Sequence, residues 1–159
     1  MRSARPPAGY RHGVGIMLID GKHRVFVGRR IGTVDGWQMP QGGIDGNEAP
    51  RVTARRELKE EIGTAKAELI AESAHWLSYD FPPTLRPSIW GGRYKGQTQK
   101  WFLMHFTGTD DDIDLDAHTP EFDAWKWIAP RDLPALVVDF KQALYAALLE
   151  EFATALEPR

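Results

Sequence analysis

Apolar residues along the chain fall into short runs with two different periods. Two β-rich runs, at residues 13–20 and 24–31, flank Asp20-Gly21, a pair that is typical of hairpin turns. A denser apolar run at residues 100–106 predicts a strand that is buried on both faces. Residues 123–129 alternate, which predicts a further strand with Trp125 and Trp127 on one side. These segments together predict a β-sheet.

A helical period appears first in the middle of the chain. A narrow apolar stripe steps by four residues and consists of Ala54, Leu58 and Ile62. Either Asp45 or Asn47 is predicted as the N-cap, and Pro50 falls in the first turn, where its missing N–H costs little. Gly63 stands where a left-handed C-terminal residue belongs. So narrow a stripe is poorly suited to burial alone, so we expect the sequence of this helix to serve chemistry.

A second helical period runs from Asp139 to Leu156. Its apolar positions are Phe140, Ala143, Leu144, Ala147, Leu148, Phe152 and Leu156. We therefore expect a C-terminal amphipathic helix. Strands around one central helix, followed by this second helix, predict an α/β sandwich.

The organisation of the chain is that of one domain. Residues 1–8, with two prolines and two arginines, are predicted to be a flexible N-terminus, and residues 9–157 a single domain. Residues 64–81 are predicted to be extended, and residues 82–96 are predicted to form a loop because they are punctuated by proline and glycine.

Composition narrows the possible partners of the protein. The 159 residues are 42% hydrophobic and 26% charged, with a formal net charge of -2, so no global basicity indicates binding to DNA or another polynucleotide. The absence of cysteine excludes disulfides and thiolate metal sites. No signal peptide and no membrane-spanning run is recognisable, so we expect a cytoplasmic protein without a membrane partner.

Three glutamates on the central helix form an acidic patch. Glu57, Glu60 and Glu61 are related by three and four residues, so their carboxylates share one face of the helix. Like charges this close call for compensation, and Mg2+ is a hard cation that prefers oxygen ligands. The alternative for such a cluster is a solvated acidic surface. A metal site becomes the better interpretation only because further residues stand in register with the patch.

Those further residues complete a known motif. Residues 42–63 contain Gly42, Glu48, Arg56, Glu57, Leu58, Glu60, Glu61 and Gly63 at the spacings G-x5-E-x7-R-E-(aliphatic)-x-E-E-x-G. This pattern resembles the signature of the Nudix hydrolases, which cleave phosphoanhydrides in nucleoside diphosphates linked to another group. The last position, usually aliphatic, is Thr64 here, a departure that concerns packing. The resemblance implies an α/β/α sandwich with a mixed sheet, a central catalytic helix and a C-terminal helix.

Stretches outside the motif resemble the bacterial RNA pyrophosphohydrolases, a group that overlaps with the dinucleoside polyphosphate hydrolases. In chain order they are Tyr10-Arg11, residues 28–30, residues 37–43, residues 96–102, residues 119–125 and residues 138–141. They span nearly the whole chain. His12, where members commonly have proline, and the short C-terminus depart from the family pattern.

The resemblance implies a role for each matching residue near the metal. Glu57, Glu60 and Glu61 hold one or more Mg2+ ions, or Mn2+ or another divalent cation, with help from Glu121 and the Gly42 carbonyl. One glutamate serves as general base, and our choice is Glu57. Arg56 is expected to pair with Glu48 and to orient the ligands. Without the resemblance, the better interpretation of Glu121 is a loop carboxylate beside Asp123.

Other matching residues are implied in substrate binding. Arg11 and Arg30 match positions that hold 5′-phosphates, whereas Arg29 is expected to be an exposed strand residue. Val138, Phe140 and Lys141 match a segment that supplies a base-stacking aromatic and a nearby cation. Phe140 also fits the apolar stripe of its helix, so a core position is its alternative.

The predicted activity is metal-assisted hydrolysis of a phosphoanhydride, with Arg11 and Arg30 offsetting phosphate charge. The substrate expected first is the 5′ end of triphosphorylated or diphosphorylated RNA, converted to a 5′-monophosphate. The alternative is a dinucleoside polyphosphate such as Ap4A. Tyr79 resembles a tyrosine that marks this specificity, and an aromatic residue of a strand is its equal alternative. A third possibility is a non-catalytic module that binds nucleotides or a protein, although the complete glutamate set argues against it.

Overall fold

The computed structural model describes residues 2–157, which are built around one mixed β-sheet. Its long central strands, β2 (Tyr10–Ile19) and β8 (Gly96–Phe106), run parallel along their whole shared length. The remaining pairs in the described part of the chain are antiparallel. Strand β3 (Val25–Arg30) pairs with β2, with β4 (Trp37–Gln38) and with β9 (Phe122–Ile128). Strand β5 (Gln41–Gly43) also pairs with β2. Both β6 (Ala67–Glu72) and β7 (Trp76–Asp80) pair with β8, and β1 (Arg2–Ser3) pairs with β7.

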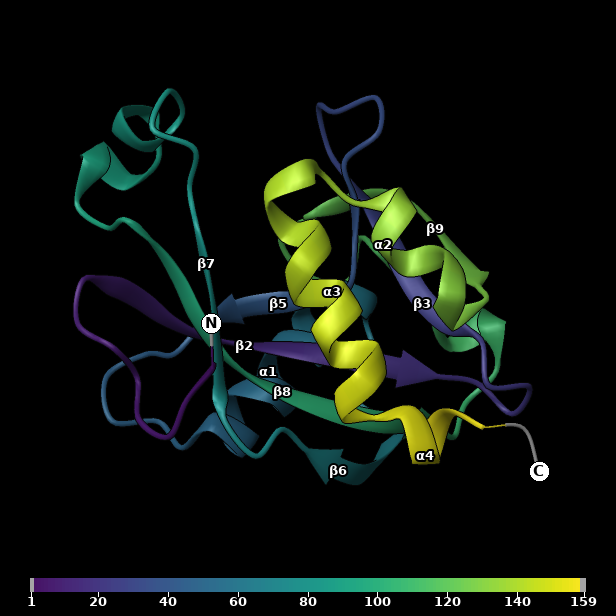
Figure 1. The fold of residues 1–159 in the computed structure, drawn as a ribbon. Coiled ribbons are helices and arrows are strands. Elements are labelled where there is room, and N and C mark those ends of the chain that lie inside the picture. Colours follow the sequence, from purple (N-terminus) through teal and green to yellow (C-terminus); the bar gives the residue numbers. More distant parts are fainter. Residues whose placement is uncertain (1, 158–159) are drawn as a thin grey trace.

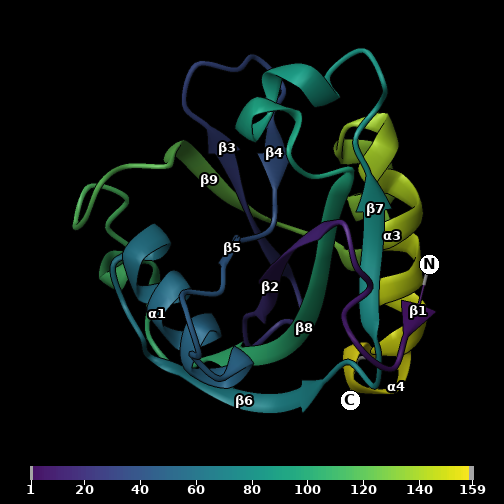
Figure 2. The ribbon, with the colours of Figure 1, turned by 90° about the vertical axis from the view of Figure 1, so that its left-hand side faces the viewer.

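Helices cover both faces of this sheet. Helix α1 (Pro50–Ile62) lies on one side (Figure 1), and α3 (Asp139–Glu151) lies on the other. Figure 2 shows the strands between these two helices, with the short α2 (Leu133–Leu136) and α4 (Ala153–Leu156) in the layer of α3. The predicted α/β/α sandwich with a mixed sheet is therefore confirmed.

Alternate residues of the central strands pack against opposite helical layers, as the two-residue period of a strand requires. On β2, Val14, Ile16 and Leu18 belong to the hydrophobic cluster that includes α1. Met17 and Ile19 belong to the separate cluster that includes α3. Strand β8 is divided between the two clusters in the same way, so the prediction of a strand buried on both faces is confirmed.

The predicted hairpin lies between β2 and β3. The carboxylate of Asp20 accepts hydrogen bonds from the backbone N–H groups of Lys22, at 3.0 Å, and Arg24, at 2.8 Å. Asp20 thus closes the turn with its own side chain. On the neighbouring strand, the rings of Trp125 and Trp127 lie 5.7 and 5.9 Å from that of Phe26, which confirms that they share one side of β9.

Helix α1 ends as the sequence predicts but begins later. Gly63 adopts a left-handed φ of 82°, and its N–H donates to the Lys59 carbonyl at 2.9 Å. Pro50 is the first helical residue. The N-cap is Ala49, with no side-chain hydrogen bond, so the prediction of Asp45 or Asn47 is wrong. Those residues lie instead in a preceding turn, which the N–H of residue 48 closes onto Asp45 at 3.0 Å.

The C-terminal helix is interrupted. Phe152, with φ of -104° and ψ of 14°, separates α3 from α4, so one continuous helix over residues 139–156 is wrong. The ring of Phe152 nevertheless stays buried with Leu144 and Leu148, as the apolar stripe predicts. Tyr145, which lies outside the predicted stripe, is fully buried beside Trp101.

Two segments outside these layers complete the fold. Arg2 and Ser3 pair with β7, and flexibility of residues 1–8 stays a prediction. Residues 82–95 connect β7 to β8 through two 3₁₀ turns, η1 (Arg86–Ser88) and η2 (Trp90–Gly92), and form the projecting lobe at the upper left of Figure 1. Over residues 2–157 no helix has the length and apolar character needed to cross a membrane.

Candidate active site

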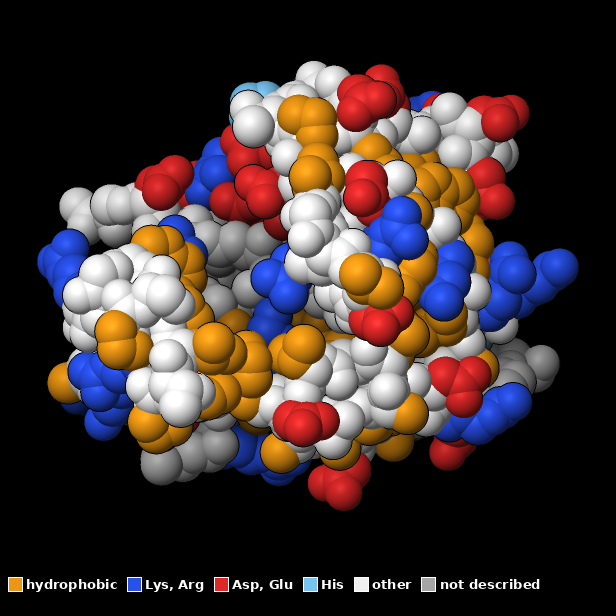
Figure 3. Space-filling view, turned by 90° about the horizontal axis from the view of Figure 1, so that it is seen from above, with side chains coloured by type: hydrophobic (Ala, Val, Ile, Leu, Met, Phe, Trp, Pro, Cys, Tyr) orange, Lys and Arg blue, Asp and Glu red, His pale blue; other side chains and the backbone are white. Residues whose placement is uncertain are grey.

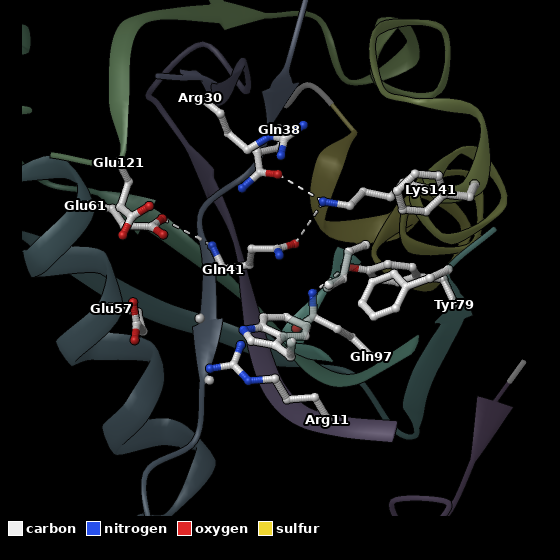
Figure 4. A pocket seen from close by; sticks show the side chains of 16 residues that line it. Arg11, Arg30, Gln38, Gln41, Glu57, Glu61, Tyr79, Gln97, Glu121 and Lys141 are labelled. Carbon is white, nitrogen blue, oxygen red and sulfur yellow. Dashed lines mark hydrogen bonds between the residues drawn. The ribbon is translucent and has the colours of Figure 1, made fainter. Parts of the chain in front are cut away.

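A cavity of about 530 Å³ opens beside α1, β5 and the first turn of α3. Pockets for small ligands are usually of roughly 300–1,000 Å³. The predicted metal ligands Gly42, Glu57, Glu61 and Glu121 line it, as do the predicted substrate-binding residues Arg11, Arg30, Phe140 and Lys141. Figure 4 shows the carboxylates on one side and the arginines and lysine across from them.

Glu61 is the most deeply placed carboxylate of the cavity. It is only 5% exposed, and it accepts a hydrogen bond from the backbone N–H of Gln41 at 3.2 Å. Burial, followed by the neighbouring charge of Glu57, raises the pKa of Glu61 well above its ordinary value. Glu121 lies beside Glu61 in Figure 4 and adds further negative charge. The site therefore disfavours ionised Glu61 unless positive charge is brought to it.

Glu57 packs directly against the strand that carries Gly42. A Cβ atom on Gly42 would collide with the Glu57 carboxyl, so only glycine lets the backbone of β5 come this close. Burial also raises the pKa of Glu57, while Arg56 opposes that shift. Main chain and carboxylates are thus brought together without an intervening side chain, an arrangement suited to oxygen ligation of a hard cation.

Arg56 forms hydrogen bonds with several carboxylates on helix α1 and just before it. Its guanidinium donates to both carboxylate oxygens of Glu48, at 3.0 and 2.9 Å, so the predicted pair is confirmed. It also donates to Glu57 at 3.0 Å and to Glu60 at 3.3 Å. The hydrogen bonds from Arg56 are the largest cause that lowers the pKa of Glu48, to about 2. Glu48 and Arg56 therefore restrain Glu57 from outside the cavity.

Three predicted site residues do not line the cavity, namely Arg56, Glu60 and Val138. The Glu60 carboxylate lies beside Arg56 and 3.9 Å from His118 Nε2, next to a smaller cavity of about 230 Å³. Val138 is the N-cap of α3, where its carbonyl accepts the N–H of Lys141 at 2.9 Å. Over residues 2–157 no three acidic or imidazole side chains are gathered tightly enough to hold a metal as they stand. Glu57, Glu61 and Glu121 thus share one side of the cavity without closing into a ligand shell.

Arg11 and Arg30 reach the cavity from neighbouring strands, whereas Arg29 does not. The Arg11 guanidinium lies where a side chain on Gly43 would be, so glycine again provides the space. Arg29 points away and pairs with Asp123 at 2.8 Å, in keeping with the prediction of a strand residue outside the site. Adjacent arginines on β3 thus have opposite surroundings.

Lys141 is almost completely buried at the inner end of the cavity. Its ammonium donates to the side-chain carbonyl of Gln38 at 2.9 Å and to that of Gln41 at 3.5 Å. Burial, together with the charge of Arg30, lowers the pKa of Lys141 to about 7. The amine therefore titrates close to neutrality, and its charge depends on what occupies the cavity.

Aromatic side chains form another part of the wall. Phe140 is partly exposed, and its ring centre lies 5.9 Å from that of Tyr79. Tyr79 is buried, accepts a hydrogen bond from the side-chain amide of Gln97 at 2.5 Å, and has a pKa raised by burial to about 12. Phe140 also packs against the hydrophobic cluster under α3. Its two predicted roles, in the cavity and in the core, are therefore both compatible with its position.

Sequence reasoning assigned no role to several residues of the cavity. Gln38, Gln41 and Gln97 contribute amide groups, and Trp90 covers Arg11. The glutamines stand inside the stretches that resemble RNA pyrophosphohydrolases, so that resemblance was a signal for them. For Trp90 the sequence carried no signal beyond its location in a loop rich in proline and glycine.

Known proteins resemble this chain along nearly its whole length. An RNA pyrophosphohydrolase of Rhodospirillum rubrum is 54% identical over 144 residues, covering 91% of this chain and 87% of that protein. An RNA pyrophosphohydrolase of Rickettsia bellii is 46% identical over 149 residues, covering 93% of this chain and 92% of that protein.

Solved structures show the same fold at low sequence identity. An Ap4A hydrolase of C. elegans, in a binary complex, has a TM-score of 0.69 and 22% identity, covering 92% of this chain and 97% of that one. The dihydroneopterin triphosphate pyrophosphohydrolase of E. coli has a TM-score of 0.67 and 22% identity, covering 89% and 98%. The family model described as the NUDIX domain matches residues 9–148. The chain belongs to the Nudix hydrolase family, as the motif over residues 42–63 predicts.

Proposed function

We propose that this protein is a metal-dependent pyrophosphohydrolase that converts the tri- or diphosphorylated 5′ end of RNA to a 5′-monophosphate. The observation that carries the proposal is one cavity with carboxylates on one wall and the cations Arg11, Arg30 and Lys141 on the other. Such a cavity suits a polyphosphate bound between metal and guanidinium groups. The relatives at 46–54% identity that are named RNA pyrophosphohydrolase support this choice of substrate.

We propose Mg2+ as the metal, with Mn2+ or another divalent cation as the alternative. Nudix hydrolases generally use divalent cations. Glu57, Glu61, Glu121 and the Gly42 carbonyl would hold the ion, and Glu60 remains a predicted ligand although it lies outside the cavity. The fit rests on the buried, mutually repelling carboxylates, whose negative charge a bound cation would neutralise. When bound, the ion would supply Lewis acidity and activate a water molecule.

The protein side chains divide the remaining work. Arg11 and Arg30 would bind the phosphate oxygens and offset charge that grows as the anhydride bond breaks. Glu57, which reaches the cavity and is restrained by Arg56, is our choice for the group that takes the proton of the attacking water. Arg56 acts on Glu57 by holding it through the hydrogen bond at 3.0 Å.

The same proposal assigns the nucleoside to the wall beside α3. Phe140 would stack a base, which is worth roughly 1–3 kcal/mol and tolerates different bases. Lys141 would contact a phosphate or a base edge from the inner end, and Val138 would border the same path. The cytoplasm is the location that we propose for the reaction, in agreement with a chain that has no cysteine.

One observation favours a second candidate, the hydrolysis of dinucleoside polyphosphates. Tyr79 and Phe140 are neighbouring rings in the cavity, 5.9 Å apart, and could together hold the base of a nucleotide. The fold is also that of a C. elegans Ap4A hydrolase, although at 22% identity this likeness concerns the fold alone. Both candidates need the same metal and arginine chemistry.

A side-by-side assay separates the two candidates. A short 5′-triphosphate RNA, labelled in its β- and γ-phosphates, and Ap4A are offered at equal concentrations with Mg2+. The proposal expects faster release of label from the RNA, whereas faster cleavage of Ap4A would promote the second candidate. The variant Glu61→Gln is run in parallel, and activity that survives this change would argue against catalysis by the glutamate cluster.

A further inference from the structure

Trp90 stands apart from the other tryptophans of the chain. All six lie within residues 2–157, and Trp90 alone is exposed, at 45% of its surface. It nevertheless lines the cavity that holds the predicted catalytic residues Glu57 and Glu61. A large indole left open to solvent at the mouth of a site is a common feature of surfaces that bind ligands.

The backbone at Trp90 is held in an unfavourable conformation. Its φ is 45°, and the two glycines that follow it also have left-handed values, 67° for Gly91 and 76° for Gly92. A tryptophan in this region is strained, and strain of this kind persists where the surroundings fix it, often at ligand sites. Hydrogen bonds from Gly92 N–H to Ile89 and from Arg93 N–H to Trp90 close the turn around it.

The indole is also oriented by a cation. The guanidinium carbon of Arg11 lies 4.3 Å from the centre of the Trp90 ring, within the range of a cation–π contact. The same guanidinium also lies close to the backbone at Gly43. Arg11 therefore links the indole to the strand that carries the Gly42 carbonyl, so Trp90 is fixed relative to the phosphate-binding end of the cavity.

A row of rings connects Trp90 to the base platform that we propose at Phe140. Phe81 lies between them, 5.8 Å from Trp90 and 6.5 Å from Phe140. Among residues 2–157 no direct ring contact joins Trp90 to Phe140. A base stacked on one of these two rings thus leaves the other available for a neighbouring base.

Basic side chains continue beyond Trp90. A second cavity of about 420 Å³ on the same lobe is lined by Arg86 and Lys95 and shares Phe81 with the first. Asp80, also at this cavity, is engaged by the Tyr10 hydroxyl at 2.5 Å. Figure 3 shows the hollow between this lobe, on its left, and the body of the protein, with acidic side chains at one end of the hollow and basic ones at its middle.

From this arrangement we propose that Trp90 is a second nucleobase platform, which stacks the base of a nucleotide next to the one on Phe140. The inference rests on the proposed function, because two successive bases, each followed by a phosphate, are a property of an RNA chain. Arg86 and Lys95 then lie where the phosphates of later nucleotides leave the cavity. Stacking explains why an exposed and strained indole is kept in this position.

The test is a double-mutant cycle between Trp90 and single bases of the RNA. Fluorescently labelled 5′-monophosphate RNAs, intact or with one abasic site at nucleotide 1, 2 or 3, are titrated with wild-type protein and Trp90→Ala by fluorescence anisotropy. We expect Trp90→Ala to weaken binding of intact RNA by roughly 5- to 100-fold. At one nucleotide position, the loss that the abasic site causes in the wild type should disappear in the variant.

Matched variants make the result specific. Trp90→Phe should retain part of the affinity, and Leu85→Ala, 44% exposed on the same lobe and outside the main cavity, should change nothing. Phe140→Ala should abolish the abasic effect at a different nucleotide. Equal abasic losses in wild type and Trp90→Ala at all three positions would overturn the inference, provided that thermal melting shows both proteins folded.

Binding and turnover keep the two proposals distinguishable. Wild-type release of phosphate from 5′-triphosphate RNA is measured in the same buffer with Mg2+. If no phosphate is released but Trp90→Ala removes the effect of one abasic site, the hydrolytic function is contradicted and Trp90 remains an RNA contact. If phosphate is released but the abasic effects are the same in wild type and Trp90→Ala, the proposed function is retained and Trp90 is rejected as a base platform.

Discussion

The two walls of the cavity are built in different ways. The acidic wall comes mainly from one helix and the strand β5, and its carboxylates are restrained by hydrogen bonds from Arg56 and the Gln41 backbone. The opposite wall collects side chains from β2, β3, α3 and the lobe at residues 82–95, which contact one another largely through rings and cations. A rigid local unit thus faces a wall assembled from distant segments. We infer that the first sets the chemistry and the second selects the molecule on which it acts.

The strongest test of this contrast is Glu61→Gln. Loss of its charge should reduce kcat by more than the ~10- to 100-fold that is typical when an outer-sphere partner of a metal is removed. The stability of the folded protein should not fall, because the change removes a buried carboxylate that its neighbours repel. Steady-state kinetics with Mg2+ and thermal melting measure both effects. Glu68→Gln, at an exposed position of β6, is the control. A change in KM with kcat unaltered would show that Glu61 contributes to substrate binding and not to the chemistry.

A smaller loss is expected from Arg56→Lys. Lysine keeps the charge but cannot make two parallel bonds to Glu48 while also reaching Glu57. We expect kcat to fall by about 10- to 100-fold with KM for RNA nearly constant. Arg55→Lys, whose side chain makes only a 3.4 Å hydrogen bond to a backbone carbonyl, should stay near wild type. Equal losses in the two variants would show that Arg56 has no special role.

On the other wall, Phe140→Ala should raise KM rather than lower kcat. Loss of one stacking surface predicts an increase of roughly 5- to 100-fold for RNA. Kinetics on 5′-triphosphate RNA and a thermal melt report binding and folding separately. Because Phe140 also packs against the α3 cluster, global unfolding of the variant would support the core role instead.

The smallest expected effect concerns the titration of Lys141. Its pKa is lowered in the folded protein to about 7 from 10.5, so above pH 7 the unfolded chain binds more protons and folding stability rises with pH. Relative to Lys141→Met, the metal-free wild type should gain about 1 kcal/mol between pH 7 and 8. Denaturant unfolding at each pH measures this difference. Lys59→Met, on the exposed face of α1, is the control, and a difference that falls with pH would contradict the assignment.

The sequence predicted the acidic wall better than its counterpart because local spacing determines most of it. The three- and four-residue steps of Glu57, Glu60 and Glu61 and the left-handed Gly63 follow from helix geometry. The Arg56–Glu48 pair joins the helix to a residue that precedes it, and it was expected from the motif. Even so, spacing could not show that Glu60 turns toward Arg56 and out of the cavity. Competition among neighbouring charges decides that choice.

Residues of the second wall were predictable only through resemblance. Arg11, Arg30 and Phe140 were assigned because their surrounding stretches match a family, and the structure brings all three to the cavity. Trp90 was missed because its contact with Arg11 joins residues that lie far apart in the sequence, and no periodicity reports such a pair. The break in the helix at Phe152 was not predicted either, because the apolar stripe continues through it.

The separation of the hydrophobic interior into two clusters has a consequence for protein engineering. The cluster that includes α1 and the one that includes α3 are separate, and they take alternate residues of the shared strands, whose neighbouring residues point to opposite sides. The α3 layer could therefore be repacked, or exchanged for that of another Nudix protein, without altering the side chains under α1. We expect chimaeras cut at the strand ends to retain the catalytic scaffold while they accept new nucleotides, which makes this sheet a natural boundary for recombination.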